Sequence, residues 1–237
     1  MRQLTSPFLF EITKHKLNGI IKSMSQRISR AIIILTWADI LIFSGFGLIM
    51  PLFAVFITGN IHGAGVTTVG FYTAIYWLAK SIFQIPIAWY LDKVEGEYDE
   101  FYAMITGYFI WSATAISYIF VSQVGHIYLL AIAAGLADAL GVPSYLSIFS
   151  RHLDRAKENI EWTLHSVGVG LSSAGAGALA GIMVEKFGFN SVFILGGVLG
   201  VASALSLFIL RPYLKATDGR SAIYHIPMSS PPDKKPL

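Results

Sequence analysis

Three ionisable side chains lie inside long apolar stretches of this sequence of 237 residues: Asp39, Lys80 and Asp138. A charge at the centre of a membrane helix costs about 2.5–3.5 kcal/mol on insertion scales, so such residues are rare and usually pair with one another or line a water-filled path. A carboxylate in that setting can also change its protonation state. The three residues therefore predict a site that binds an ion, a proton or a small solute.

The expected depths of these residues in a membrane are similar. At a rise of 1.5 Å per residue, Lys80 and Asp138 each lie roughly 16 Å from the inner end of their apolar run, and Asp39 lies roughly 12 Å from the end of its own. Such closeness favours mutual neutralisation inside a helix bundle. The alternative is a static Lys80–Asp138 pair that only fixes helix register. His165 lies roughly 5 Å from the inner surface by the same measure, which favours an interfacial position over a proton relay.

Six apolar runs must position these side chains. Each run is long enough for about 20 helical residues, the number that crosses a hydrocarbon core roughly 30 Å thick. Backbone groups in lipid must bond within their own segment, so each run predicts an α-helix. The expected spans lie at about 31–58, 68–91, 102–122, 127–149, 162–184 and 191–210. Together they predict an all-α, polytopic membrane protein whose six transmembrane helices form one domain over 31–211.

The composition agrees with a membrane protein and argues against an enzyme. Hydrophobic residues make up 54% of the chain and charged residues 13%, whereas soluble domains carry about 25% charged residues. The absence of cysteine excludes disulfides, thiolate metal sites and cysteine nucleophiles. The sequence contains no HExxH, GxSxG, Walker A or dinucleotide-binding motif. We therefore expect no catalytic residues, no metal and no cofactor.

Lysine and arginine residues gather in alternate connecting segments. Residues 1–30, the connectors 92–101 and 150–161, and the C-terminal tail with Arg211 hold 15 of the 17 basic residues. Because Lys and Arg favour the cytoplasmic side, both termini are predicted to be cytoplasmic in a multi-pass protein of the cell membrane. The net charge of +3 is then a topology signal. The expected partners are the lipid bilayer and a small-molecule or ion substrate, not nucleic acid.

The two ends of the chain differ in character from the six spans. Residues 1–30 are basic, with apolar residues at helical spacing, which is typical of an amphipathic helix on the inner leaflet. The alternative is that translation begins at Met24. Residues 212–237 are rich in proline and predict a disordered cytoplasmic tail.

Charged residues in two of the inner connectors are candidates for a cytoplasmic gate. Asp92 and Lys93 lie in the acidic 92–101 connector, and Arg151 and Arg155 lie in the basic 150–161 connector. An acidic loop beside a basic loop can form a salt-bridge network that opens and closes with conformation. The alternative is solvated surface charge that contributes little to stability.

Glycines at four-residue spacing are candidates for helix contacts. Gly177 and Gly181 repeat in the fifth span, and Gly196 and Gly200 repeat in the sixth. Small residues at this spacing let two helix backbones approach closely in lipid. Packing alone explains the pattern, and the fifth span is also a place where helices could slide.

Three motifs in the spans carry a family resemblance. Residues 44–53 read SGFGLIMPLF, residues 88–93 read AWYLDK, and residues 177–181 read GALAG, followed by FGF at 187–189. In that order they resemble the first helix, the loop between spans 2 and 3, and the fifth helix with its exit loop of the major facilitator superfamily of transporters. The resemblance covers roughly residues 25–213.

The sequence also departs from that family's pattern. Gly96 comes one residue late in the loop motif, and Glu97 and Tyr98 stand where the family has basic residues. Ala131 occupies a position early in span 4 where the family often has an arginine. These departures weigh against the family's usual gating role for the loop.

The resemblance implies secondary active transport of a small solute by alternating access, possibly coupled to protons. It also implies a half bundle built from two inverted three-span repeats. Family members normally have twelve spans, so a six-span chain calls for a homodimer, a second six-span half from another chain, or a longer protein of which this is a fragment. The competing function is a non-transporting membrane interaction or assembly protein that keeps the fold.

Overall fold

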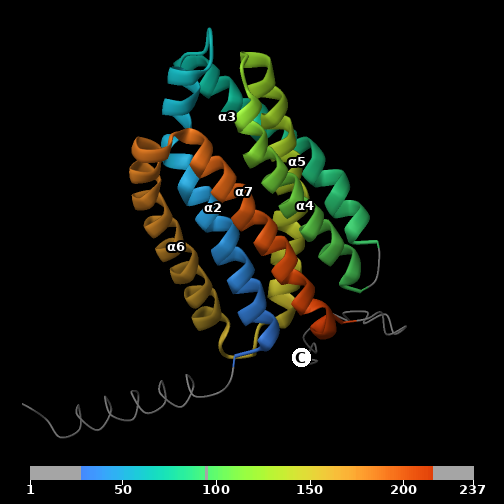
Figure 1. Cartoon of the computed structure of the whole chain (residues 1–237). Helices are drawn as coiled ribbons and strands as arrows, with labels where there is room; N and C mark the ends of the chain where they lie inside the picture. The colour runs from blue at the N-terminus through green and yellow to red at the C-terminus, as the bar shows by residue number, and fades with distance from the viewer. Residues whose placement is uncertain (1–27, 94–95, 216–237) are drawn as a thin grey trace, which may run out of the picture.

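The computed structural model describes residues 28–93 and 96–215 and consists there of one helical bundle (Figure 1). Expectations for the rest of residues 1–30 and 212–237 lie outside the described residues. The helices are α2 (Arg30–Asn60), α3 (Val66–Leu91), α4 (Tyr98–Ser117), α5 (Val124–His152), α6 (Glu158–Phe187) and α7 (Phe189–Ser206), with the 3-10 helices η1 (Tyr118–Phe120) and η2 (Leu207–Tyr213). The expectation of an all-α protein with six long helices is confirmed.

Five of these helices are long and apolar enough to cross a membrane: α2, α4 with η1, α5, α6, and α7 with η2. The sixth long helix, α3, has 26 residues, so it is roughly 39 Å long at 1.5 Å per residue. Polar residues, among them Lys80 and Gln84, lower the mean hydropathy of α3. Helix α3 nevertheless packs along α5 in the same bundle.

The helices pack as two related sets of three. Helix α2 packs on α6 and α7, and α5 packs in the same way on α3 and α4, while α4 and α7 meet each other. The list of packing partners stays the same when α2, α3 and α4 are exchanged for α5, α6 and α7, respectively. This symmetry is what two three-helix repeats, α2–α4 and α5–α7, predict. Its consequence is that the first helix of each repeat packs against the second helix of the other.

Two helices extend beyond the apolar runs at their inner ends. Helix α4 starts at Tyr98 with Asp99 and Glu100 in its first turn, and α6 starts at Glu158 with Glu161 in its first turn. Carboxylates in the first turn interact favourably with the positive end of the helix dipole. These acidic residues therefore continue the helices on the inner side of the stretches that hydropathy marks as spans.

Close helix contacts depend on glycine, although not at every expected position. A Cβ at Gly196 would lie 2.9 Å from Ile49 Cδ1, and one at Gly200 would clash with Ser112, so a larger residue at either position would force a neighbouring side chain to move. A Cβ at Gly177 would be in ordinary contact with the Gly47 carbonyl at 3.5 Å. The expectation for Gly181 is wrong within this bundle, because a Cβ there would meet nothing within 4 Å among the described residues.

One glycine outside the expected set brings α3 and α5 together. A Cβ at Gly135 would lie 2.7 Å from the Tyr76 carbonyl oxygen and 2.9 Å from the Lys80 nitrogen. Only a residue without a side chain permits this backbone approach. Asp138 follows Gly135 by one helical turn, so the contact places its carboxylate beside α3.

Candidate functional site

The carboxylate of Asp39 joins three helices. Asp39 lies on α2 with 4% of its surface exposed. Its Oδ1 accepts a hydrogen bond from the Tyr108 hydroxyl of α4 at 2.5 Å, and its Oδ2 lies 2.8 Å from Nε2 of His165 on α6. A buried carboxylate needs such donors, because burial removes the water molecules that would otherwise hydrate its charge.

The second carboxylate, Asp138 on α5, is paired with Lys80 on α3. Lys80 Nζ lies 3.1 Å from Asp138 Oδ2, and the Tyr76 hydroxyl donates to the same oxygen. Tyr76 precedes Lys80 by four residues, so both donors project from one face of α3. Side-chain exposures of 14% for Lys80 and 18% for Asp138 show that a small molecule such as water can contact the pair.

The two ionic groups occupy equivalent positions in the two three-helix repeats. Asp39 and Asp138 lie on the first helix of their repeats, α2 and α5, and each pairs with a basic residue on the second helix of the other repeat. The basic residue is His165 for Asp39 and Lys80 for Asp138. The basic partners differ in chemistry: one is an imidazole ring and the other is an ammonium group on a flexible four-carbon chain.

Both groups line one cavity of about 400 Å³ between α2, α3, α4, α5 and α6. A second cavity of about 280 Å³ adjoins it. Phe46, Tyr76, Trp111 and Asp138 line both, so they form the boundary between the two spaces. The structure thus brings Asp39, Lys80 and Asp138 to one cavity, as two separate ionic groups and not as one cluster.

The wall of the larger cavity also holds a buried hydroxyl that faces the Asp39 carboxylate. The Tyr145 side chain is buried, and its hydroxyl interacts with Asp39 without a hydrogen bond of ordinary geometry. Its ring lies 5.5 Å from that of His165, centroid to centroid. An unsatisfied buried polar group costs about 1–3 kcal/mol. A water molecule or a polar group of a ligand in the cavity would satisfy this hydroxyl.

Sequence reasoning missed three tyrosines of this wall, Tyr76, Tyr108 and Tyr145, and it favoured an interfacial position for His165. Nothing in the spacing of the 11 tyrosines distinguishes an inward-facing hydroxyl from one at the membrane surface. For His165 the depth was counted from the end of the apolar run, but α6 begins earlier, at Glu158. Counted from there, His165 lies roughly 10 Å along its helix, close to the level of Asp39.

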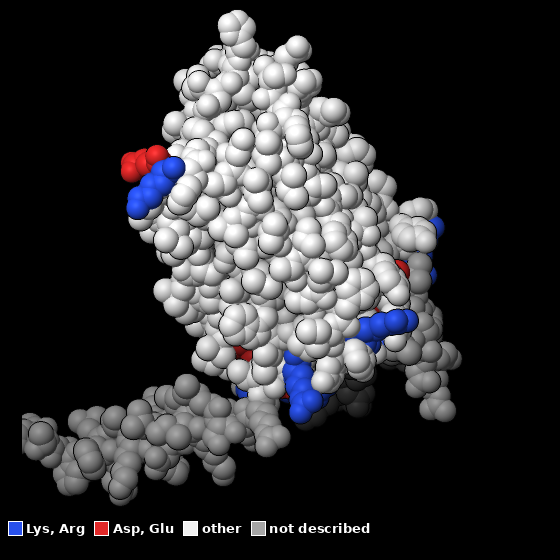
Figure 2. All heavy atoms as spheres, in the orientation of Figure 1, with Lys and Arg blue, Asp and Glu red and all other residues white. Residues whose placement is uncertain are grey.

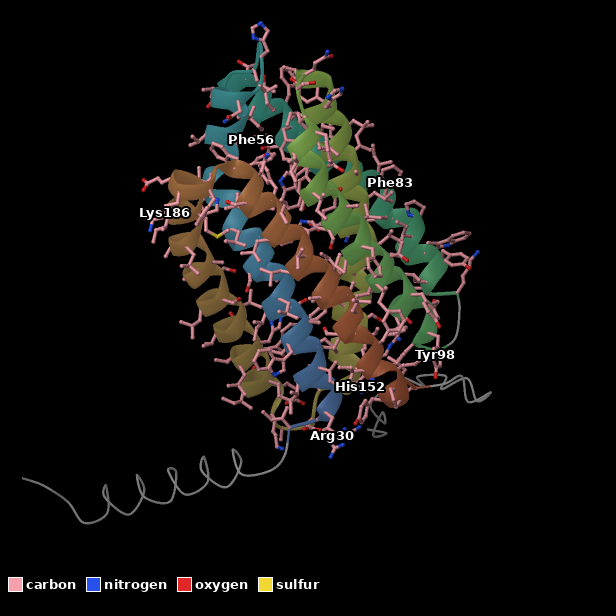
Figure 3. All side chains as sticks on the ribbon, viewed as in Figure 1. Arg30, Phe56, Phe83, Tyr98, His152 and Lys186 are labelled. Carbon is pink, nitrogen blue, oxygen red and sulfur yellow. The ribbon has the colours of Figure 1, made fainter. Side chains whose placement is uncertain are left out.

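The N-terminal end of α4 and the C-terminal end of α5 are joined by a second ionic network. Arg151 NH1 lies 2.7 Å from Glu100 Oε1, and His152 Nε2 lies 2.9 Å from Glu97 Oε2. The Lys215 backbone amide donates to the same oxygen of Glu97 at 2.9 Å. Figure 3 places His152 at the end of the bundle where Arg30 and Tyr98 lie, opposite Phe56.

This network differs from the expected cytoplasmic gate. Arg151 takes part, but Asp92 and Arg155 are exposed and make no ion pair in the described part of the chain. Lys93 lies with its Nζ 3.1 Å from the centroid of the Trp89 ring. The physical reason is the position of the helix ends: α4 begins after Glu97, which directs its first acidic residues towards α5, whereas Asp92 ends α3 in solvent.

The pKa of Glu97 reflects these contacts. Burial alone would raise the pKa, but the hydrogen bonds from His152 and from the Lys215 amide outweigh it, so the pKa lies below its ordinary value of 4.5. A carboxylate with a lowered pKa contributes stability that is fully present above the ordinary value. That contribution is lost as the pH falls through the lowered value.

Glu97→Gln should destabilise the protein at pH 7 by about 1–3 kcal/mol, the usual effect of losing hydrogen bonds to a charged group. Thermal unfolding in nanodiscs from pH 7 to pH 3.5 measures this. The variant should lose less of its stability on acidification than the wild type. Glu185→Gln, at an exposed carboxylate outside the first turn of any helix, is the matched control and should change neither quantity. Equal acid sensitivity of wild type and Glu97→Gln would contradict the assignment.

Comparison with known protein families agrees with this architecture. Residues 35–224 match the family described as Major Facilitator Superfamily. The matched range takes in every residue of the two ionic groups and both cavities, and most of the described chain.

Proposed function

We propose that this chain, which belongs to the major facilitator superfamily, is a proton-coupled transporter that exposes its cavity alternately to the two sides of the membrane. Membership of that family implies a multi-pass membrane protein that carries out secondary transport of a small solute, and not an enzyme. Proton coupling, the roles of individual residues and a dimeric assembly are our inferences. The observation that carries them is the single cavity bounded by two ionic groups of different chemistry.

We assign the proton to Asp39 and His165. Their side chains meet between α2 and α6, which belong to different repeats. Uptake of a proton changes the charge of this pair, and charges about 4 Å apart interact by roughly 4 kcal/mol at an effective dielectric constant of 20. Protonation would thus alter the attraction between two helices that must shift relative to each other in a rocking bundle.

We assign the solute to Lys80 and Asp138. This pair is more exposed to the cavity than Asp39, and Asp138 borders both cavities. A pair with access to the cavity can exchange partners with an entering polar molecule. The static alternative, in which Lys80 and Asp138 only fix helix register, gives no reason for the adjoining empty space.

We infer that a second six-helix unit covers the cavity mouth in the membrane. Lys80 and Asp138 line the larger cavity and are partly exposed, and a cavity mouth open to hydrocarbon would be costly for these charges. The exposed Trp77 lines the smaller cavity and offers an apolar rim for contact. A second copy of the chain or a different six-helix half would each supply the cover.

The orientation that we propose places both termini in the cytoplasm of a cell whose plasma membrane holds the protein. On the face drawn in Figure 2, Lys and Arg gather at the lower end of the bundle, and most of the wall above is uncharged. The lower end is where α2 begins and the described chain ends (Figure 1). The preference of basic residues for the cytoplasmic side supports this assignment.

Transport can be tested in proteoliposomes that contain the pH-sensitive dye pyranine, with a panel of small amines, carboxylates and sugars added outside. We expect one solute class to drive a proton flux. Asp39→Asn and Asp138→Asn should each lower it about tenfold or more, the factor that corresponds to 1.4 kcal/mol of lost interaction. Asp92→Asn, at an exposed carboxylate without an ion pair among the described residues, is the control and should retain the flux.

Two results would contradict this account. Full transport by Asp39→Asn, Asp138→Asn and Lys80→Ala would show that the site is elsewhere. A wild type that moves no solute of the panel, while the same substitutions only lower its thermal stability, would favour a membrane assembly protein that keeps the fold.

The assembly can be tested by light scattering of the protein in detergent. We expect twice the chain mass of 25.9 kDa. Trp77→Ala should shift the population towards monomer, because it removes apolar contact area beside the cavity. Trp37→Ala removes an equally exposed tryptophan that lines neither cavity and should leave the dimer intact. A wild type that is monomeric at every concentration would rule out the homodimer.

A further inference from the structure

The ammonium group of Lys80 occupies a cage of one carboxylate and two aromatic rings. Its Nζ lies 3.1 Å from Asp138 Oδ2, 5.0 Å from the centroid of the Trp77 ring and 6.0 Å from that of Tyr76. A carboxylate together with aromatic faces is the set of groups by which proteins recognise organic ammonium ions. Lys80 reaches this cage on a flexible four-carbon chain, so it fills a binding position that it can also leave.

The space beside the cage is lined with more aromatic rings. Phe46 and Trp111, whose ring centroids lie 4.4 Å apart, border both cavities together with Asp138. Tyr72 and Tyr118 close the smaller cavity. Cavities of about 280 and 400 Å³ are near the lower end of the range that holds small ligands. An organic group attached to an ammonium would thus have apolar and aromatic walls to contact.

The charges of the cavity wall also leave room for one more cation. Among the described residues that line the larger cavity, Asp39 and Asp138 are acidic, Lys80 is basic and His165 is a titratable base. The wall thus sets one lysine ammonium against two carboxylates, so a monovalent cation would balance the second carboxylate. An anionic solute would face two carboxylates, and its capture of Lys80 would leave Asp138 without its counter-ion, which is costly in a buried site.

We propose that the solute of this site is a small organic cation with an aromatic or aliphatic body, whose ammonium replaces that of Lys80 at Asp138. This inference rests on the transport function proposed above and names its substrate class. The Tyr76 hydroxyl keeps its hydrogen bond to Asp138 during the exchange. The displaced Lys80 ammonium stays in the wall of the larger cavity, where Asp39 is the remaining carboxylate. The aromatic rings shared by the two cavities hold the body of the ligand.

Chemical rescue of a Lys80 variant tests this proposal without a transport assay. Lys80→Ala leaves space and an unpaired carboxylate at Asp138, so the cation has no internal competitor. The probes are benzylamine, benzyl alcohol and benzoate, which share a ring and differ in charge. We expect benzylamine to quench the tryptophan fluorescence of the wild type saturably and to bind Lys80→Ala about tenfold more tightly, as loss of about 1.4 kcal/mol of competition would give. It should also raise the unfolding temperature of that variant more than that of the wild type.

Two controls separate specific binding from partition into lipid. Asp138→Asn, alone and combined with Lys80→Ala, should abolish saturable binding of benzylamine, and benzyl alcohol should not compete with it. Because Asp138→Asn is compared with the wild type directly, the test stands even where Lys80→Ala does not fold. Asp92→Asn should bind benzylamine like the wild type.

Three results would overturn the cation assignment. The first is saturable binding of benzoate that is lost in Lys80→Ala, which would identify an anion site. The second is equal binding of benzylamine by the wild type and Asp138→Asn. The third is weaker binding of benzylamine by folded Lys80→Ala than by the wild type. Transport of an anion or a sugar alongside any of these would leave the proposed function standing, whereas benzylamine binding without any transport would contradict the function and not the site.

Discussion

Charged groups that a helix bundle carries into a membrane must be paired or hydrogen-bonded within the bundle, and this constraint links the main features of the structure. Asp39 and Asp138 each meet it with a basic residue and a tyrosine hydroxyl. The first group joins α2, α4 and α6, and the second joins α3 and α5, so five of the six long helices are held by ionic contacts around one cavity. Replacing a single partner leaves a buried charge unpaired, which is more costly than losing an ordinary contact.

In the mechanism that we propose, the relation between the two repeats gives the two ionic groups different roles. In both, a carboxylate on the first helix of one repeat faces a base on the second helix of the other. One base is a histidine and the other a lysine, which suits the first group to a proton and the second to exchange with a charged solute. Movement of one repeat against the other would change both contacts together. Coupling between proton and solute then needs no connection beyond the shared cavity.

The length of the apolar runs predicts the helices, because the thickness of the bilayer sets the length of a membrane-spanning helix. The similar expected depths of Lys80 and Asp138 predict that these two side chains meet. The contact of His165 with Asp39 could not be predicted from the sequence, because hydropathy does not show that α6 begins before its apolar run, at Glu158. Tyr108 and Tyr145 were missed because a tyrosine hydroxyl in the bundle has the same sequence pattern as one at the surface. The ionic network at the ends of α4 and α5 includes neither Asp92 nor Arg155 in the described part of the chain, since connector charge does not reveal where the next helix begins. The four-residue spacing of glycines predicts the close contacts of Gly196 and Gly200. It does not reveal that Gly181 faces away from the other described helices.

Access to the cavity from each side of the membrane tests the central claim most directly. The chain has no native cysteine, so Val142→Cys places one thiol in the wall of the larger cavity. A membrane-impermeant maleimide is added to one side of sealed proteoliposomes of known orientation, and then to the other side in a second sample. Alternating access predicts labelling from both sides, with the ratio of the two rates shifting with pH. Gly181→Cys, outside both cavities, should remain unlabelled in each case. Labelling of Val142→Cys from one side only, at every pH, would contradict a cavity that opens to the two sides in turn.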